Sequence, residues 1–292
     1  MMRPRRNDRE HGVALIAVLC LIALLTLLAT TVTTMSAIQR RAVSRAEDRV
    51  QLEYEADSAI RVMLLRLIAP RPLHQKYVLN QPMRLTVFDS DVEIVMRRES
   101  GCIDLNRADE ALLYAVFASN GWDEKGARQM AARIADWRDA DDLVREGGAE
   151  RAEYAAAGLK YSPRNAAFES VEELRQVLGG ELIAPELMDA FTVYSHLNAP
   201  PAVFANTVAY RALAYAHARS LAGRSWLIVS ERRERDAGPV WDETPSLDGE
   251  VIRVSACARR ATARACRVVY VRPTGNLQKP LQTFSWRAER FD

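Results

Sequence analysis

The stretch VALIAVLCLIALLTLLA at residues 13–29 decides how the rest of the chain is organised. It is almost entirely aliphatic, and no charged residue occurs between His11 and Gln39. Because about 20 apolar residues are needed to cross a bilayer, we expect a membrane-spanning helix at about 13–34. The alternative is a cleaved secretory signal, but residues 30–37 (TTVTTMSA) offer only a mediocre cleavage site of small residues.

The expected helix extends far beyond this apolar stretch. Apolar side chains recur at helical spacing from Val50 to Leu67, and Pro70 and Pro72 then end the pattern. A single helix over 13–70 would be roughly 85 Å long at about 1.5 Å per residue. A rod of this length has no purpose in a compact enzyme and is typical of a filament subunit.

The composition indicates that the chain folds and that the part after residue 12 has no net charge. Of the 292 residues, 49% are hydrophobic, which excludes general disorder. The first twelve residues hold four arginines and two acids, which leaves 36 basic and 36 acidic residues in the remainder. A neutral body argues against a nucleic-acid partner that is recognised by bulk charge.

A short basic segment precedes the apolar stretch and ends at Gly12. Its four arginines, followed by Gly12 and the run Val13-Ala-Leu-Ile-Ala, resemble the class III signal of type IV pilins and pseudopilins; they are Arg3, Arg5, Arg6 and Arg9. The resemblance implies that a prepilin peptidase cleaves between Gly12 and Val13 and methylates the new N-terminus, so that 1–12 is a leader. It also implies a single-pass protein of the bacterial inner membrane with a periplasmic soluble domain. Charge alone does not set this orientation, because four more arginines occur at 40–49.

The fifth residue after the expected cleavage point is Ala17. Most pilins carry a glutamate at this position, which neutralises the N-terminal amine of the neighbouring subunit in the filament. The K-type minor pseudopilin of type II secretion is the family member that lacks it. An alanine is also what an unrelated anchor helix would have, so Ala17 favours the K-type without deciding it.

An inserted helical region carries the most specific resemblance. The phrases DLNRADEALL, NGWDEKGARQMAARIADWRDADD and SVEELRQVLGG resemble the SAM-like helical insertion of K-type pseudopilins over roughly 101–194. The family's "NxNTA" phrase is missing, since Leu197 and Asn198 precede two prolines, so we expect a divergent second module with a short helix at about 202–222.

Alternating patterns predict strands before and after the helices. We expect a hairpin from 83–88 and 92–96 around Asp89-Ser-Asp91, and further strands at 226–230, 250–255, 266–271 and 283–286. The predicted fold class is α+β: a long N-terminal helix packs on a pilin-like antiparallel sheet (71–101 and 225–292), with a helical SAM-like domain (102–224) inserted between the strands.

An acidic cluster follows the second of two helices that we expect in this insertion, at about 109–119 and 123–137. Asp139, Asp141, Asp142 and Glu150 do not fit the EF-hand pattern, because Leu143 and Val144 stand where a ligand and a glycine are needed. Dense carboxylates suit a hard cation with oxygen ligands. K-type proteins bind calcium in their soluble domain, so the resemblance implies a calcium site here. The alternative is a solvated acidic loop that pairs with Arg138 and Arg145.

The cysteines and histidines show no zinc spacing. Cys257 and Cys266 flank a short segment between two predicted strands, where hairpin pairing would bring them together, so we expect a disulfide in an oxidising periplasm. The alternative is two independent thiols. Cys20 is expected to face lipid or a partner helix, and Cys102 to be a small buried residue.

Two function classes remain. No nucleophile elbow, Walker loop, HExxH or recognisable Cys/His pair occurs, so we do not expect an enzyme. The leading hypothesis is the large minor pseudopilin at the tip of the type II secretion pseudopilus, partnered by I- and J-type minor pseudopilins. The alternative is a membrane-anchored periplasmic nucleic-acid or ligand-binding protein of the helix-hairpin-helix kind. Its phosphate-binding hairpin would be 120–124, where Asp123 and Glu124 disfavour an anion.

Overall fold

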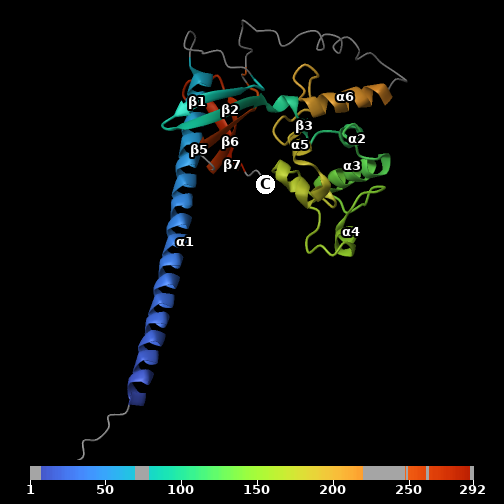
Figure 1. The fold of residues 1–292 in the computed structure, drawn as a ribbon. Coiled ribbons are helices and arrows are strands. Elements are labelled where there is room, and N and C mark those ends of the chain that lie inside the picture. The colour runs from blue at the N-terminus through green and yellow to red at the C-terminus, as the bar shows by residue number, and fades with distance from the viewer. Residues whose placement is uncertain (1–7, 70–78, 220–246, 248, 261–262, 290–292) are drawn as a thin grey trace, which may run out of the picture.

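The computed structural model describes residues 8–69, 79–219, 247, 249–260 and 263–289. Its first element, α1 (Asp8–Ile68), is one helix of 61 residues. Figure 1 shows α1 as a rod whose N-terminal half projects away from everything else and whose C-terminal part packs on a sheet. The helix ends two residues before Pro70, because a proline disfavours the helical conformation of the residue that precedes it.

The sheet has five strands in the order β1-β2-β5-β6-β7, and every neighbouring pair is antiparallel. The strands are β1 (Pro82–Val87), β2 (Ser90–Arg98), β5 (Ile252–Arg260), β6 (Ala263–Pro273) and β7 (Leu281–Glu289). The strand expected at 226–230 lies outside the described residues. The mixture of helices and an antiparallel sheet confirms the coarse fold class.

The turn between β1 and β2 differs from the prediction. The alternating pattern placed Phe88 at the end of a strand and centred the turn on 89–91, but Val87 pairs with Ser90, so the turn consists of Phe88 and Asp89. The tighter turn keeps Met83, Leu85 and Val87 on the face that packs against the core. Phe88 therefore lies in the turn and not in the strand.

One face of the sheet packs on α1. The helix contributes a face of buried residues, and β2, β5 and β6 contribute the opposing apolar side chains; the helical residues are Leu52, Ala56, Ala59, Ile60, Met63, Leu64 and Leu67. Asp57 fixes the position of the helix, since it accepts hydrogen bonds from Arg267 Nε at 2.9 Å and from Trp286 Nε1 at 2.7 Å.

All other helices that the described residues form lie between β2 and β5 in the sequence. They are η1 (Glu99–Gly101), α2 (Glu110–Ala118), α3 (Glu124–Arg138), α4 (Arg151–Ala156), η2 (Val171–Gln176), η3 (Gly180–Leu182), α5 (Pro185–Met188) and α6 (Thr207–Arg219). A short parallel pair, β3 (Ile103–Asp104) with β4 (Phe191–Thr192), joins the start of this helical region to its end. These elements enclose a separate apolar core, and Figure 1 shows them on the side of the sheet away from α1.

Side-chain caps explain why two of these helices begin where the sequence predicted. Asp109 accepts a hydrogen bond from Leu112 N at 2.7 Å, and Asp123 accepts one from Gly126 N at 2.7 Å. Each carboxylate thus satisfies a backbone donor at the start of α2 or α3. The helix predicted at 202–222 begins later, at Thr207, because 202–204 form a turn and Asn206 caps α6 through Ala209 N. Its predicted end lies outside the described residues.

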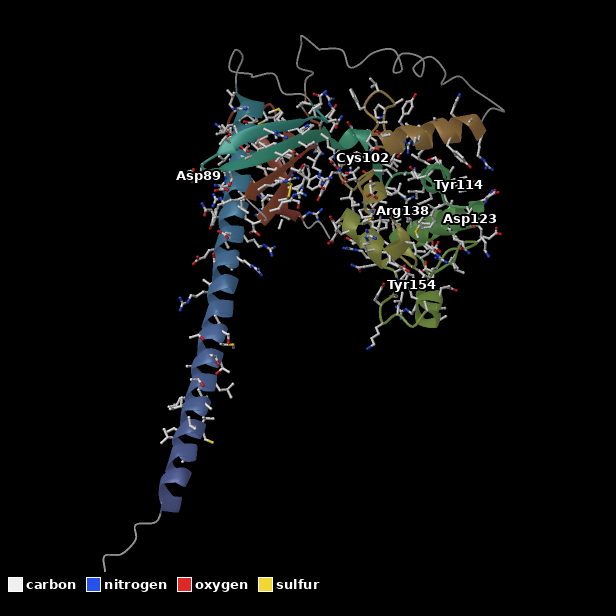
Figure 2. The ribbon with its side chains drawn as sticks, in the orientation of Figure 1. Asp89, Cys102, Tyr114, Asp123, Arg138 and Tyr154 are labelled. Carbon is white, nitrogen blue, oxygen red and sulfur yellow. A yellow bond between two sulfur atoms is a disulfide. The ribbon has the colours of Figure 1, made fainter. Side chains whose placement is uncertain are left out.

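The DLN phrase is a structural motif. Asp104 is buried and accepts hydrogen bonds from Asn106 N at 2.9 Å and His196 N at 2.7 Å. Asn106 exchanges two hydrogen bonds with the backbone of Phe168, and Arg138, labelled in Figure 2, donates to the carbonyls of Leu105 and Ala108. These polar groups hold together segments that are distant in the sequence.

Ion pairs and aromatic contacts join the helical region to the sheet. Arg97 of β2 and Arg253 of β5 both bind Asp189, at 3.2 and 3.0 Å. Arg287 of β7 binds Glu172 with two hydrogen bonds of 2.6 and 2.7 Å. Aromatic rings add contacts on the same face, where Tyr194 packs against Tyr270 and Phe284. The two parts of the molecule are therefore held in one orientation.

Candidate functional site

The N-terminal half of α1 is a free apolar rod. One helix in the described part of the chain is long and apolar enough to cross a membrane, at Ala17–Met35, with a mean hydropathy of 2.2 and no part of it buried in the protein. Its threonine hydroxyls all donate to backbone carbonyls three or four residues earlier; they are Thr26, Thr30, Thr31, Thr33 and Thr34. Because these bonds satisfy the hydroxyls within the helix, the segment is compatible with a hydrocarbon environment.

Beyond this segment, α1 exposes apolar side chains opposite the sheet. Val43, Val50, Tyr54 and Leu65 are all more than half exposed. With 3.6 residues per turn they lie within an arc of about 60°. This exposed face is opposite the helix face that packs on the sheet.

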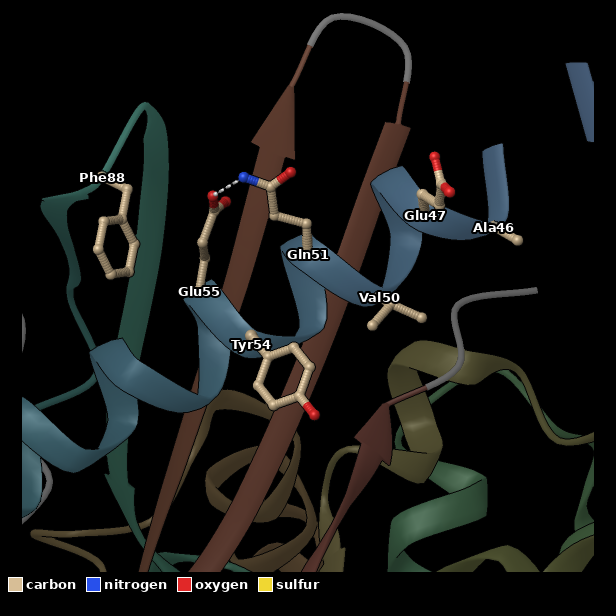
Figure 3. Close-up of a pocket in the computed structure, with 7 residues that line it drawn as sticks. All are labelled: Ala46, Glu47, Val50, Gln51, Tyr54, Glu55 and Phe88. Carbon is tan, nitrogen blue, oxygen red and sulfur yellow. Dashed lines mark hydrogen bonds between the residues drawn. The ribbon is translucent and has the colours of Figure 1, made fainter. Parts of the chain in front are cut away.

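A shallow groove lies between this exposed face and the β1–β2 turn (Figure 3). It is lined by Ala46, Glu47, Val50, Gln51, Tyr54, Glu55 and Phe88. Glu55 is buried at its edge, where it pairs with Arg260 at 2.8 Å and accepts a weaker hydrogen bond from Gln51 at 3.4 Å. The groove is therefore a largely apolar surface with acidic residues along one side.

Phe88 is the most unusual residue of the groove. Its side chain is 80% exposed, and its φ of 52° lies in the left-handed region that bulky residues avoid. An exposed phenylalanine gains nothing from the core, and this backbone conformation costs free energy. A turn residue that is unfavourable in the isolated chain is a candidate for contact with a partner.

The second candidate site is the loop after α3, which folds around one buried carboxylate. Asp136 is fully buried and accepts hydrogen bonds from Arg145 Nη1 at 2.7 Å and Ala149 N at 2.8 Å. Arg145 also pairs with Asp139. Gly148 packs so closely that a Cβ there would collide with the Asp136 carboxylate. Sequence reasoning missed Asp136, because its side chain points inward from a helix that otherwise looks amphipathic.

Several buried oxygens near this loop have no hydrogen-bond partner. They are both carboxylate oxygens of Glu150, Oδ1 of Asp139 and Oδ1 of Asn165. Burial, followed by the negative charges of Asp136, Asp139, Asp142 and Asp141, raises the pKa of Glu150 to about 7. Oxygen ligands of this kind are usually neutralised by a metal or a base.

The four acids predicted as metal ligands are therefore not equivalent. Asp141 and Asp142 are exposed, and they accept hydrogen bonds from Leu143 N and from the Asn165 amide. In the described residues no group of three or more histidine, cysteine or acidic side chains is arranged as a metal site. The orphaned oxygens belong instead to two acids and the amide of Asn165, a residue that the sequence pattern did not indicate. Arg145 pairs with the loop, as the alternative expected, whereas Arg138 does not.

The hairpin considered for phosphate binding is filled by its own side chains. Asp123 caps α3 at the place where a phosphate would bind, and Trp122 packs against Phe117 with ring centroids 5.1 Å apart.

Of the four cysteines, Cys257 and Cys266 stand opposite each other in β5 and β6 and form a disulfide. Cys20 is exposed and Cys102 is buried. Gly12, Val13 and Ala17 all lie within α1.

Comparisons with known proteins agree with this architecture. Residues 101–192 match the family model described as type II secretion system (T2SS), protein K. The fold matches a chain in the crystal structure of the GspK-GspI-GspJ complex from the enterotoxigenic Escherichia coli type 2 secretion system, with a TM-score of 0.55 and 15% identity over 87% of this chain and 100% of that chain. None of the curated proteins compared with the sequence matches it. The family-model match is confined to the helical region at 101–192, and the structural match shows that the chain shares its fold with that pseudopilin chain.

Proposed function

We propose that this chain is the minor pseudopilin at the tip of a type II secretion pseudopilus, where it starts or caps the fibre that exports folded proteins across the outer membrane. A prepilin peptidase would cleave after Gly12 and methylate Val13, and the apolar part of α1 would anchor the protein in the inner membrane with its head in the periplasm. The helical elements between β2 and β5 would form the SAM-like insertion of K-type proteins.

The observation that carries the tip assignment is the combination of Ala17 with a head that has two parts. A subunit with Ala17 lacks the carboxylate that would meet the terminal amine of a subunit above it, yet its own amine is free to receive a carboxylate from below. The helical region beside the sheet also makes this head wider than the head of a subunit that has no such region. Both features favour a position with no subunit above.

The partners proposed for this tip are I- and J-type minor pseudopilins, whose helices would pack along the exposed face of α1. A photo-reactive residue at Val50 should form adducts with these two proteins and none with a second copy of the chain. A ladder of self-adducts would contradict the tip assignment. The same probe at Leu277, which is 98% exposed on the β6–β7 connection, is the control for random collision.

The groove supplies a sharper test, because Phe88→Gly should change stability and assembly in opposite directions. Glycine adopts a positive φ without strain, so the free protein should be as stable as the original or more stable by about 0.5–1 kcal/mol. Loss of the ring should weaken co-purification with I- and J-type partners about tenfold or more. Leu277→Gly removes an apolar side chain that is even more exposed, on another part of the surface, and should leave assembly unchanged. Unaltered co-purification of the Phe88 variant would exclude the groove as the docking surface.

We also propose that the loop after α3 binds calcium. The orphaned oxygens of Glu150, Asp139 and Asn165 are hard ligands of the type calcium prefers, and backbone carbonyls and water would complete its coordination. A bound cation would neutralise the acids around Glu150 and hold the loop against α3. Asp141 and Asp142 would contribute mainly through their charge.

A further inference from the structure

We propose that the arginines just beyond the membrane-length segment, Arg40, Arg41 and Arg45, bind the headgroups of anionic phospholipids in the outer leaflet of the membrane. This basic collar, as we call these three residues, lies on α1 between the apolar rod and the folded head. The inference rests on the membrane anchoring proposed above, but it names a surface and a ligand that anchoring by itself does not require.

The charge pattern of α1 is the first observation. Between Met35, where the apolar segment ends, and Glu47 the sequence holds three arginines and no acid. Arg40 and Arg45 are exposed, and within the described residues neither has an acidic partner. Farther along the helix, over 47–57, acids outnumber arginines, and Arg49 pairs with Glu53 at 3.1 Å. The collar is thus the part of α1 next to the apolar segment that carries positive charge with no acid beside it in the sequence.

The height of these residues above the hydrocarbon is the second observation. Because α1 is continuous, each residue adds about 1.5 Å, so Arg40 lies about 7 Å and Arg45 about 15 Å beyond Met35. The headgroup layer on each side of a bilayer is about 5–7 Å thick. Arg40 and Arg41 therefore lie at the level of the phosphates, and Arg45 lies within about one Debye length, about 8 Å, of them. Arg49, at about 21 Å, is beyond that range.

The orientation of the chain gives a further reason why the positive charge of the collar needs a negative partner. Arginines on the periplasmic side of a span oppose the usual distribution, in which lysine and arginine gather on the cytoplasmic side. The leader arginines balance them only until the predicted cleavage after Gly12. In the mature protein the collar would be the main positive charge flanking the span. Anionic headgroups would neutralise this charge at the place where it lies.

A partner helix with acidic residues is the competing occupant, and the position of the collar argues against it. Contacts between pseudopilin heads would involve the groove around Val50 and Tyr54, more than 20 Å beyond the apolar segment by the rise of about 1.5 Å per residue. At the level of Arg40 the nearest abundant acids are phosphates. Arginine suits them, because its guanidinium donates two parallel hydrogen bonds to phosphate oxygens.

The test uses the full chain reconstituted in nanodiscs with equal amounts of phosphatidylcholine and phosphatidylglycerol. Native mass spectrometry after release should show retained phosphatidylglycerol enriched over phosphatidylcholine by about tenfold or more, given that each arginine near the surface contributes about fivefold. The triple variant Arg40→Gln, Arg41→Gln, Arg45→Gln should retain the two lipids about equally. The control removes three exposed arginines of the helical region, with the changes Arg107→Gln, Arg151→Gln and Arg211→Gln. It should keep the enrichment.

The outcomes separate this inference from the proposed anchoring. Resistance to alkaline extraction from the same membranes tests anchoring alone. If the protein stays in the membrane and the original chain retains both lipids equally, the collar does not bind headgroups. The inference is also overturned if the collar variant keeps the enrichment, or if it loses only co-assembly with I- and J-type partners while its lipid ratio is unchanged.

Discussion

Replacing Glu150 by glutamine should have opposite effects on stability without and with calcium. Without calcium, the buried carboxylate of Glu150 has no hydrogen-bond partner, and its pKa is raised from 4.5 to about 7. Because the pKa in the folded state exceeds the unfolded value, the folded protein loses stability as pH rises between these two values, and the loss remains complete above pH 7. The shift corresponds to at most about 3 kcal/mol, which solvent near the loop reduces to about 1–2 kcal/mol.

The variant should therefore be more stable than the original chain at pH 8 in the presence of a chelator, and nearly equal to it at pH 5. With calcium the order reverses. A ligand that binds only the folded state at a hundred times its Kd adds about 2.7 kcal/mol. Since about 1 kcal/mol corresponds to roughly 2–4 °C for a protein of this size, calcium should raise the Tm of the original chain by about 5–10 °C. The variant should gain much less.

The assay is thermal unfolding of the full chain in detergent, followed by circular dichroism at both pH values, with a chelator and with millimolar calcium. Glu146→Gln is the matched control, because Glu146 lies in the same loop but is exposed. It should behave as the original chain does under all four conditions. An equal calcium-dependent gain in the Glu150 variant would refute the ligand assignment. A variant that is less stable than the original chain at pH 8 without calcium would refute the account of the buried charge.

Three further outcomes are expected. Replacing Gly12 by valine should block processing, so that intact-mass analysis finds the leader still attached; a mature chain beginning at Val13 in this variant would be inconsistent with the predicted signal. Gly148→Ala should lower stability by about 2–4 kcal/mol in denaturant titrations, because its Cβ would collide with the carboxylate of Asp136, and an unchanged midpoint would show that the loop has room to move. Reduction of the Cys257–Cys266 disulfide, which closes a short hairpin, should cost about 2–3 kcal/mol, and a Tm insensitive to reductant would contradict this.

The sequence predicted the locally determined elements well. The starts of α2 and α3 follow from the aspartates that cap them, and the end of α1 follows from Pro70. The predicted strand at 250–255 overlaps β5, which begins at Ile252, and the one at 266–271 lies within β6, because alternation of apolar and polar residues is visible in a short window. The turn at Phe88 was misplaced, since a phenylalanine in a left-handed conformation contradicts the preference on which the prediction relied.

The sequence predicted which loop holds the candidate metal site but not which residues in it would be the ligands. Four acids in one loop indicated a cation, but their spacing did not show which oxygens remain without partners. Asn165 approaches Asp142 from 23 residues away, and Asp136 binds Arg145 and the backbone of Ala149 across the loop. These contacts depend on how the loop folds back on α3, which no local pattern encodes.

By itself the sequence determined the parts that depend on residue type and near neighbours: the apolar rod, the basic collar, the caps of the helices and the alternating strands. Only the tertiary structure decided which side chains lack partners and which faces remain free. It packed one face of α1 on the sheet and left Val50 and Tyr54 exposed, and it buried Glu150 among other acids without a hydrogen bond. The physical reason is that burial and pairing are set by segments far apart in the chain, whereas helix capping and strand alternation are set within a few residues.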